Sequence, residues 1–272
     1  IGDNGRSFLP DLCQADRNNL LSAFIGGVVF NASNILLSAA ISICGMSVAF
    51  PVGVGLALVL GVLINYFTLA KGEPLFLFIG VTLIVVAILL NALAYRKART
   101  GVHKVPLKGI WIAIVAGGIM SFFYSFVASS MDLTDFVHPA AGKLTSYTAV
   151  FLFSLGVFGS NFLFNTLAMK YPVNDVPISI SQYFKGRFPT HLVGIAGGVI
   201  WCIGQTFSLI ASEKAGSAIS YGLGQGATLV SALWGILVWK EFKGCPRISV
   251  WLNIGMFVLF IGGLALLIYA GA

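Results

Sequence analysis

The chain has 272 residues, of which 58% are hydrophobic and only 9% are charged, whereas soluble domains carry about 25% charged residues. With a mean hydropathy of +0.94, it is not an ordinary soluble globular protein, and we interpret it as a membrane protein whose backbone polar groups are satisfied within helices. The formal net charge of +7 follows largely from membrane topology, as the loops below indicate, so it does not point to a nucleic-acid partner.

Residues 1 to 19 are polar and contain Gly, Pro and Asp, which is typical of a loop. The chain does not begin with Met, and its first residues lack the basic stretch followed by an apolar run that marks a signal peptide. We therefore expect this sequence to be a fragment that starts within a longer protein.

Eight apolar segments follow, each about as long as the roughly 20 residues that a helix needs to cross a bilayer. The sequence thus predicts an all-α polytopic membrane protein. The expected helices are Leu20 to Ile43, Met46 to Leu69, Leu75 to Tyr95, Gly109 to Ser130, Ser146 to Met169, His191 to Ser212, Ser217 to Trp239 and Ser249 to Ala270.

The loop between the third and fourth helices, residues 96 to 108, contains five Lys and Arg and no acid. Such a loop is the strongest candidate for the cytoplasmic side of a plasma-membrane protein. Alternation of the helices then places most other basic residues on the same side, and seven of the nine acids on the opposite side. Both ends of the chain are expected to face the outside.

An internal repeat relates the first helix pair to a later one. When the sequence is shifted by 171 positions, Gly26-Gly27 falls on Gly197-Gly198, Phe30 on Trp201 and Asn34 on Gln205. The same shift, without a gap, places Gly45 on Gly216, Phe50 on Tyr221, Pro51 on Gly222, Gly53 on Gly224 and Gly55 on Gly226. A repeat with interrupted helices at corresponding places is the best sequence signal for a transporter's binding site.

The two copies are five helices apart, and an odd separation inverts the second copy in the membrane. The second copy would contain five helices and the first only three, so the offset predicts two further helices upstream and ten in all, as a five-plus-five inverted repeat. The expected units are an incomplete first repeat at 1–95, the basic cytoplasmic loop at 96–108 and a second repeat at 109–272.

Ten helices in an inverted repeat, with the ending Trp239-Lys240-Glu241 after a repeat helix, resemble the drug/metabolite transporter superfamily. Within it, the sequence is similar to the ureide permease family. The stretches that carry this likeness are 26–34 (GGVVFNASN), 63–67 (LINYF), Tyr171-Pro172-Val173 with Pro177, and 229–241 (LVSALWGILVWKE).

The resemblance implies transport of ureides such as allantoin, or of nucleobases such as uracil. Two features qualify it. Plant ureide permeases have a longer central loop with a nucleotide-binding-like motif, but residues 96–108 contain no Gly-x-x-x-x-Gly-Lys-Ser/Thr pattern, so no ATP coupling and no cofactor is implied. Glucose and rhamnose permeases of the same superfamily are also similar around the first repeat helices, so a sugar permease remains an alternative.

No expected helix contains a carboxylate, Lys or Arg in its middle, and the polar residues buried within the helices are neutral. Carboxamides both donate and accept hydrogen bonds, which suits urea and amide groups as well as sugar hydroxyls, and an aromatic ring can stack on a flat substrate. The repeat pairs Asn34/Gln205 and Phe50/Tyr221 are therefore the leading candidates. The full set of expected substrate-binding residues is Asn34, Phe50, Gln205, Tyr221, Asn31, Gln225 and Trp201.

Each of these residues has an alternative structural role. An intramembrane Asn or Gln often joins two helices, at about 1 kcal/mol, and Phe50 or Tyr221 could serve only in packing. The expected hinge or helix-break residues are Pro51, Gly53, Gly55, Gly222, Gly224 and Gly226. Small residues at four-residue spacing also let helices approach closely, and packing is the more common role.

No motif indicates an enzyme. Asp132, Asp135 and His138 could suggest a metal site, but we interpret them as part of a solvated loop. The four cysteines share no metal spacing, and no disulfide is predicted. We expect a carrier that moves a small neutral metabolite by alternating access, with the lipid bilayer as its surroundings and a homodimer as a candidate assembly. The alternative from another class is a membrane subunit or sensor that transports nothing.

Overall fold

The computed structural model describes residues 6–68, 73–98, 107–135, 138–173, 176–240 and 242–270. Most of the expected basic loop, Leu69 and Glu241 lie outside these ranges. The elements are α1 (Phe8–Gln14), α2 (Arg17–Cys44), α3 (Met46–Ala49), the π-helix η1 (Phe50–Val54), α4 (Gly55–Thr68), α5 (Pro74–Ala98), α6 (Leu107–Ser130), α7 (Ser146–Lys170), α8 (Ile180–Phe184), α9 (Phe188–Ala215), α10 (Ser217–Gly224), α11 (Ala227–Leu237) and α12 (Arg247–Ala270).

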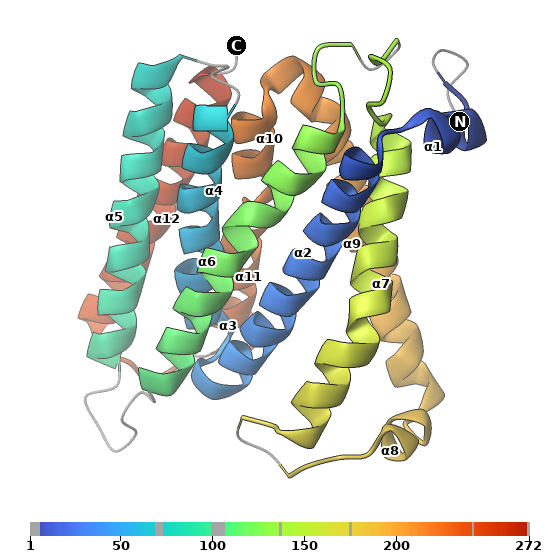
Figure 1. The fold of residues 1–272 in the computed structure, drawn as a ribbon. Helices are drawn as coiled ribbons and strands as arrows, with labels where there is room; N and C mark the ends of the chain where they lie inside the picture. Colours follow the sequence, from blue (N-terminus) through green and yellow to red (C-terminus); the bar gives the residue numbers. More distant parts are fainter. Residues whose placement is uncertain are drawn as a thin grey trace.

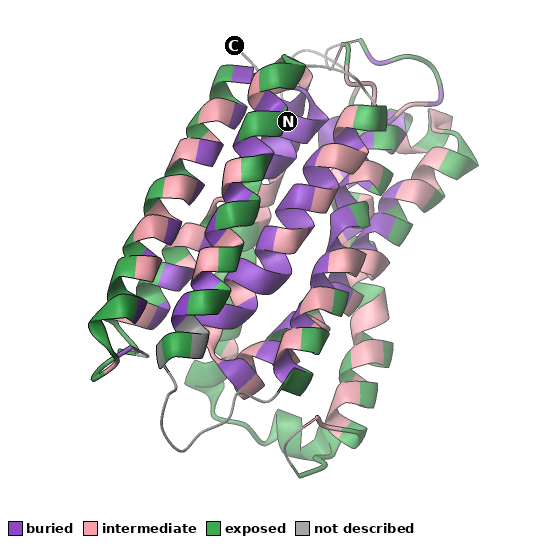
Figure 2. Ribbon diagram, turned by 90° about the vertical axis from the view of Figure 1, so that its left-hand side faces the viewer, coloured by how far each residue is buried: buried purple, intermediate pink, exposed green. Residues whose placement is uncertain are grey.

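The long helices run up and down a single bundle (Figure 1). In the described ranges, α2 packs against α6 and α7, α5 packs against α12, and α4 packs against α6 and α10. The two chain ends lie at one end of the bundle, and the helix ends that flank the α5–α6 connection lie at the other (Figure 1). Buried residues form stripes on the inward faces of the helices, while outward faces are exposed (Figure 2), as expected for a bundle surrounded by lipid.

Within the described residues, seven helical stretches are long and apolar enough to cross a membrane, which confirms an all-helical, multi-pass membrane protein. One of them is Met46–Thr68, which joins α3, η1 and α4. The expected continuous helix from Ser217 to Trp239 is not found as one element, because it is broken into α10 and α11 at Gln225 and Gly226. Glycine adds backbone freedom without side-chain packing, so a glycine-rich stretch is a natural place for a helix to end.

The equivalent stretch of the first helix pair is also interrupted. Pro51 lies in the π-helix η1, where its missing N–H removes one helical hydrogen bond and favours local widening of the helix. η1 ends at Val54, and Gln225, its equivalent at the repeat offset, begins the break between α10 and α11. The two irregular segments therefore fall at matching positions.

The helices α2 and α9 also match in length and position. Each has 28 residues, and α9 begins and ends 171 positions after α2. Each is followed by a glycine with positive φ, Gly45 at φ 84° and ψ 163° and Gly216 at φ 82° and ψ 153°, a conformation that favours glycine. In Figure 1, α2 runs away from the end that holds the chain termini and α9 runs toward it.

Candidate substrate groove

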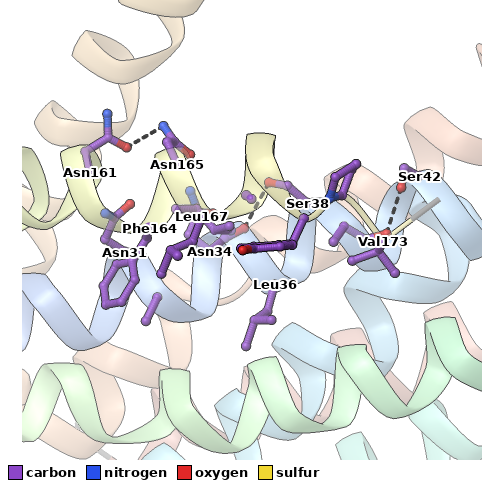
Figure 3. A pocket seen from close by; sticks show the side chains of 16 residues that line it. Asn31, Asn34, Leu36, Ser38, Ser42, Asn161, Phe164, Asn165, Leu167 and Val173 are labelled. Carbon is purple, nitrogen blue, oxygen red and sulfur yellow. Dashed lines mark hydrogen bonds between the residues drawn. The ribbon is translucent and has the colours of Figure 1, made fainter. Parts of the chain in front are cut away.

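A groove of about 820 Å³ lies between the second halves of α2 and α7 (Figure 3). Its volume falls within the range of about 300–1,000 Å³ that is common for small-molecule sites. The lining residues are Asn31, Ala32, Asn34, Ile35, Leu36, Ser38, Ala39, Ser42, Asn161, Phe164, Asn165, Leu167, Ala168, Tyr171, Pro172 and Val173.

Helical periodicity explains the polar lining. Asn31, Asn34 and Ser38 share one face of α2 because they are spaced three and four residues apart. Asn161 and Asn165, four residues apart on α7, line the opposite wall. The sequence thus places four carboxamides on two facing helices.

A close crossing of the two helices sets the inner limit of the groove. A methyl group added to Gly27 would lie 2.0 Å from the carbonyl oxygen of Phe153, and one added to Gly156 would lie 2.1 Å from the carbonyl oxygen of Phe24. Only glycines permit such an approach of two helix backbones. The polar residues begin one turn after this crossing, at Asn31, where the groove opens.

Three of the four carboxamides take part in side-chain hydrogen bonds. Nδ2 of Asn31, which is buried, donates to Oγ of Ser160 across the helix pair at 3.0 Å. Nδ2 of Asn165 donates to Oδ1 of Asn161 at 2.6 Å (Figure 3). In the described part of the chain, no hydrogen bond is found for the side chain of Asn34, which is exposed in the groove and can both donate to and accept from a ligand.

The lining contains no ionisable side chain other than the phenol of Tyr171. Charged groups select a ligand of opposite charge, whereas carboxamides and hydroxyls bind neutral polar groups. Phe164 and Tyr171 add aromatic surface. The groove is therefore suited to a neutral, polar ligand with a flat or apolar face.

A pair of repeat-related aromatic rings lies beside the groove. Phe30, which directly precedes Asn31, stacks on Trp201 with ring centroids 4.5 Å apart and planes inclined by 25°. Phe153 contacts both rings, at 5.6 Å from Phe30 and 6.0 Å from Trp201. Residues related by a twofold operation can stack on each other only close to its axis, so this stack is where an axis between α2 and α9 would pass.

The expected pair Asn34 and Gln205 is not brought together. Each lies four residues beyond its stacked aromatic, and α2 and α9 run in opposite directions. Four residues of an α-helix rise about 6 Å, so the two carboxamides lie on opposite sides of the stack. Asn34 lines the groove, whereas Gln205 does not; its Nε2 is buried without a hydrogen-bond partner in the described structure.

The pair Phe50 and Tyr221 is also separate from the groove. Tyr221 is buried, and its hydroxyl donates to the backbone oxygen of Ala57 at 3.0 Å. Its ring lies 5.2 Å from that of Tyr124 in an edge-on arrangement. Phe50 is half-buried at the start of η1. Both positions fit the packing role that the sequence left open.

The remaining expected residues lie in or next to the interruptions of the two repeat-related helices. Gln225 lies in the break between α10 and α11. The expected hinge residues lie in or next to these interruptions, with Pro51 and Gly53 in η1, Gly55 opening α4, Gly222 and Gly224 in α10, and Gly226 in the break. Gly53 also packs, since a methyl group there would lie 3.0 Å from the backbone oxygen of Ala113.

Asn161 and Asn165 were not among the expected binding residues. Their four-residue spacing, which places two carboxamides on one face of α7, was a usable signal. The repeat could not rank them, because positions 171 residues earlier lie before residue 1. Asn91 and Asn253, in contrast, lie away from the groove: Nδ2 of Asn91 donates to Oδ1 of Asn253 at 3.3 Å and links α5 to α12.

The loop with Asp132, Asp135 and His138 forms local hydrogen bonds instead of a metal cluster, and no group of three metal-binding side chains is found in the described ranges. Oδ1 of Asp132 accepts from the backbone N–H and the hydroxyl of Thr134, at 3.0 and 2.6 Å. The hydroxyl of Thr134 contributes most to lowering the pKa of Asp132 from 3.8 to about 2.

Comparison with known proteins agrees with the multi-pass helical architecture described above. The family model of the ureide permeases matches residues 95–270. The chain is 23% identical to Ureide permease 1 of Arabidopsis thaliana, over 98% of this chain and 82% of that protein.

Two bacterial proteins named for sugar uptake are also similar. The putative sugar uptake protein YxfA of Lactococcus lactis is 28% identical over 91% of this chain and 78% of its own length. The probable glucose uptake protein GlcU of Staphylococcus aureus is 25% identical, over 85% and 71% respectively. No solved structure matches the chain.

Proposed function

This chain belongs to the ureide permease family, and we propose that it carries a small neutral metabolite with urea or amide groups, such as allantoin or uracil, through the α2–α7 groove. As a member of this family it is a multi-pass membrane permease and not an enzyme. The substrate, the transport cycle and the orientation in the membrane are the parts that we propose.

The four carboxamides in the groove are the observation that carries the substrate proposal. A ureide presents several N–H donors and carbonyl acceptors along its edges, and each has a complementary partner on a carboxamide. Allantoin and uracil are uncharged at neutral pH, which agrees with the absence of Asp, Glu, Lys and Arg from the lining. Burying a polar ligand without such partners would be costly, so carboxamides at this place favour a polar cargo.

We infer that transport uses two inverted repeats, with α2–α4 and α9–α11 as equivalent helices. Three features support this: the equal lengths of α2 and α9, the positive-φ glycines that follow them, and the matching interruptions of the next helices. The stack of Phe30 on Trp201 would then lie on the axis between the repeats. On this proposal, the groove on the Asn34 side of the Phe30–Trp201 stack is open in this structure. A rocking motion of the two repeats against each other would open the Gln205 side instead.

The orientation follows from charge. Arg96, Lys97, Lys108 and the basic residues after α7, α8 and α11 lie on the same side if the helices alternate. An excess of Lys and Arg marks the cytoplasmic side. We therefore propose that the groove, which ends near Tyr171 to Val173, faces the cytoplasm of a plasma-membrane carrier.

The test is uptake of labelled allantoin by cells that express the natural full-length reading frame, with unlabelled uracil and glucose as separate competitors. Saturable uptake that uracil blocks and glucose does not would support the proposal. If the protein is present at the membrane and no allantoin enters, the ureide substrate is refuted, and labelled glucose becomes the next substrate.

A sugar is the second candidate. Carboxamides and Ser hydroxyls also pair with sugar hydroxyls, and an aromatic ring such as that of Tyr171 can cover a sugar ring. The relatives named for sugar uptake support this alternative. Uptake of glucose that allantoin does not inhibit would decide in its favour.

Replacing Asn34 tests the binding site itself. Asn34→Ala removes a hydrogen bond to the substrate, worth about 0.5–1.5 kcal/mol, so we expect KM for uptake to rise roughly 2- to 12-fold at unchanged membrane expression. The matched control is Asn18→Ala, an exposed carboxamide in the first turn of the same helix and outside the groove. Equal KM values for the two variants would exclude Asn34 as a binding residue.

A further inference from the structure

The hairpin of α9 and α10 is cross-linked by hydrogen bonds between two serines. Oγ of Ser208 on α9 donates to the backbone oxygen of Ser220 on α10 at 3.2 Å, and Oγ of Ser220 donates to the backbone oxygen of Ser208. The hairpin turns at Gly216, at the end of the bundle that holds the chain termini (Figure 1). Its two arms are therefore linked to each other close to that end.

Two tyrosine hydroxyls link this hairpin to neighbouring helices. The hydroxyl of Tyr124 on α6 donates to the backbone oxygen of Ser208 at 3.1 Å. The hydroxyl of Tyr221 on α10 donates to the backbone oxygen of Ala57 on α4 at 3.0 Å. Both tyrosines are buried, and a methyl group added to Gly61 on α4 would overlap the ring of Tyr221. The α9–α10 hairpin is thus bound to both α6 and α4.

The equivalent hairpin of α2 and α3 lacks these hydroxyls. The side chains 171 positions before Ser208, Ser220 and Tyr221 are those of Leu37, Ala49 and Phe50. None of the three can donate a hydrogen bond. This hairpin turns at Gly45, at the opposite end of the bundle from α10 (Figure 1), and the groove residues Ser38 and Ser42 lie in its first arm. The two repeat-related hairpins therefore differ in the side-chain hydrogen bonds that they can form.

Such a difference affects the balance between two conformations of a carrier. In an inverted-repeat carrier, equivalent elements at the two ends exchange open and closed conformations during the cycle. A contact that forms at one end only favours the conformation in which that end is closed. One hydrogen bond shifts such an equilibrium roughly 2- to 12-fold. The hydroxyls of the α9–α10 hairpin thus favour the conformation seen here, in which the groove is open toward the other end.

We propose that the α9–α10 hairpin is the gate at the end that holds the chain termini, and that hydroxyls close it in the resting carrier. The residues that supply these hydroxyls are Tyr124, Ser208, Ser220 and Tyr221. They are positioning residues, because they act through closure of the gate and line no part of the groove. The inference rests on the transport cycle proposed above.

The first test measures how fast a membrane-impermeant maleimide reacts with the thiol of Ala57→Cys. The full-length protein is used, with its four native cysteines replaced by alanine. Ala57 is fully buried and its backbone oxygen is bound to Tyr221, so reagent on the α1 side should reach this thiol only when the gate opens. Tyr124→Phe removes one hydrogen bond of the gate and should raise the reaction rate roughly 2- to 12-fold.

The matched control is Asn91→Ala, which also removes one interhelical hydrogen bond between buried side chains, but between α5 and α12. A general loss of stability would raise the reaction rate of Ala57→Cys in both variants. Opening of the gate would raise it only in Tyr124→Phe. Equal rates in the two variants would therefore refute the proposal.

A second measurement distinguishes a gate from local loosening of the hairpin. In the double variant Asn34→Cys and Ala57→Cys, a bulky maleimide is first attached at position 57 from the α1 side, so that the hairpin cannot close again. If this hairpin is one gate of an alternating-access carrier, the thiol at position 34 should lose its reactivity toward reagent on the α8 side. Unchanged reactivity at position 34 would show that the two ends move independently, and would overturn the proposal.

These labelling experiments need no substrate, so the two proposals can fail separately. The expected labelling without allantoin uptake would refute the ureide substrate and leave the gate intact. Allantoin uptake with equal labelling in Tyr124→Phe and Asn91→Ala would refute the gate and leave the substrate proposal intact.

Discussion

The crossing of α2 and α7 at Gly27 should be the most sensitive packing contact near the groove. In Gly27→Ala, the new methyl group would lie 2.0 Å from the carbonyl oxygen of Phe153, 2.8 Å from the backbone nitrogen of Val157 and 3.0 Å from Cα of Gly156. All three are backbone atoms, which cannot rotate away. Because non-bonded atoms pack at about 3.5 Å, the helices must separate by more than about 1 Å.

Overpacking of this kind lowers the free energy of unfolding by about 1–3 kcal/mol. The better helix propensity of alanine offsets up to about 1 kcal/mol of this loss. We therefore expect Gly27→Ala to lower the free energy of unfolding by about 1–2 kcal/mol, measured as a reduced thermal midpoint in detergent. Uptake should fall as well, since the groove begins one turn after the crossing.

The matched control is Gly159→Ala on α7, where an added methyl group meets nothing within 4 Å. Its midpoint should be unchanged or slightly higher, because the substitution gains helix propensity without a clash. If Gly27→Ala is as stable as Gly159→Ala, the close crossing is not present in the membrane protein, and the account of the groove's inner limit fails.

Two further predictions concern the bundle core and the loop after α6. Tyr221→Phe removes the hydrogen bond to the backbone oxygen of Ala57 and should destabilise the protein by about 1 kcal/mol, whereas Tyr147→Phe, at an exposed position, should leave the thermal midpoint unchanged. The pKa of the Asp132 carboxylate is lowered from 3.8 to about 2, chiefly by the hydroxyl of Thr134. The ionised carboxylate therefore stabilises the loop fully above about pH 4, and this stabilisation is lost as the pH falls toward 2. Pepsin cleavage within residues 131–145 should therefore accelerate between pH 4 and pH 2 in the wild type more than in Asp132→Asn, and equal pH dependence would contradict this assignment.

Much of the helical framework could be predicted from the sequence. Wherever an expected helix end falls on a described residue, it lies within three residues of the observed end, except at the break after Gly224. Helix length and hydropathy are local properties, so the sequence alone specifies them. The interruption at Gln225 and Gly226 was expected as a loosened helix, but whether glycines bend, widen or break a helix depends on the neighbours that satisfy the freed backbone groups.

The candidate site was less predictable. The repeat singled out Asn34, which lies in the groove, but it also grouped Gln205 with it, and these two side chains lie on opposite sides of the Phe30–Trp201 stack. An inverted repeat brings two equivalent residues together only when they lie close to its axis. The sequence offset identifies equivalent positions and contains no information on their distance from that axis.

The sequence by itself determined that this is a multi-pass helical membrane protein, which segments are helices and which positions repeat, because hydrophobic length, charge bias and glycine or proline placement act locally along the chain. Only the tertiary structure decided that α2 and α7 form the groove and that Asn161 and Asn165 line it together with Asn31 and Asn34. The physical reason is that a groove depends on where two helices cross and diverge. That geometry is set by the contact of Gly27 with Gly156, two residues far apart in the sequence.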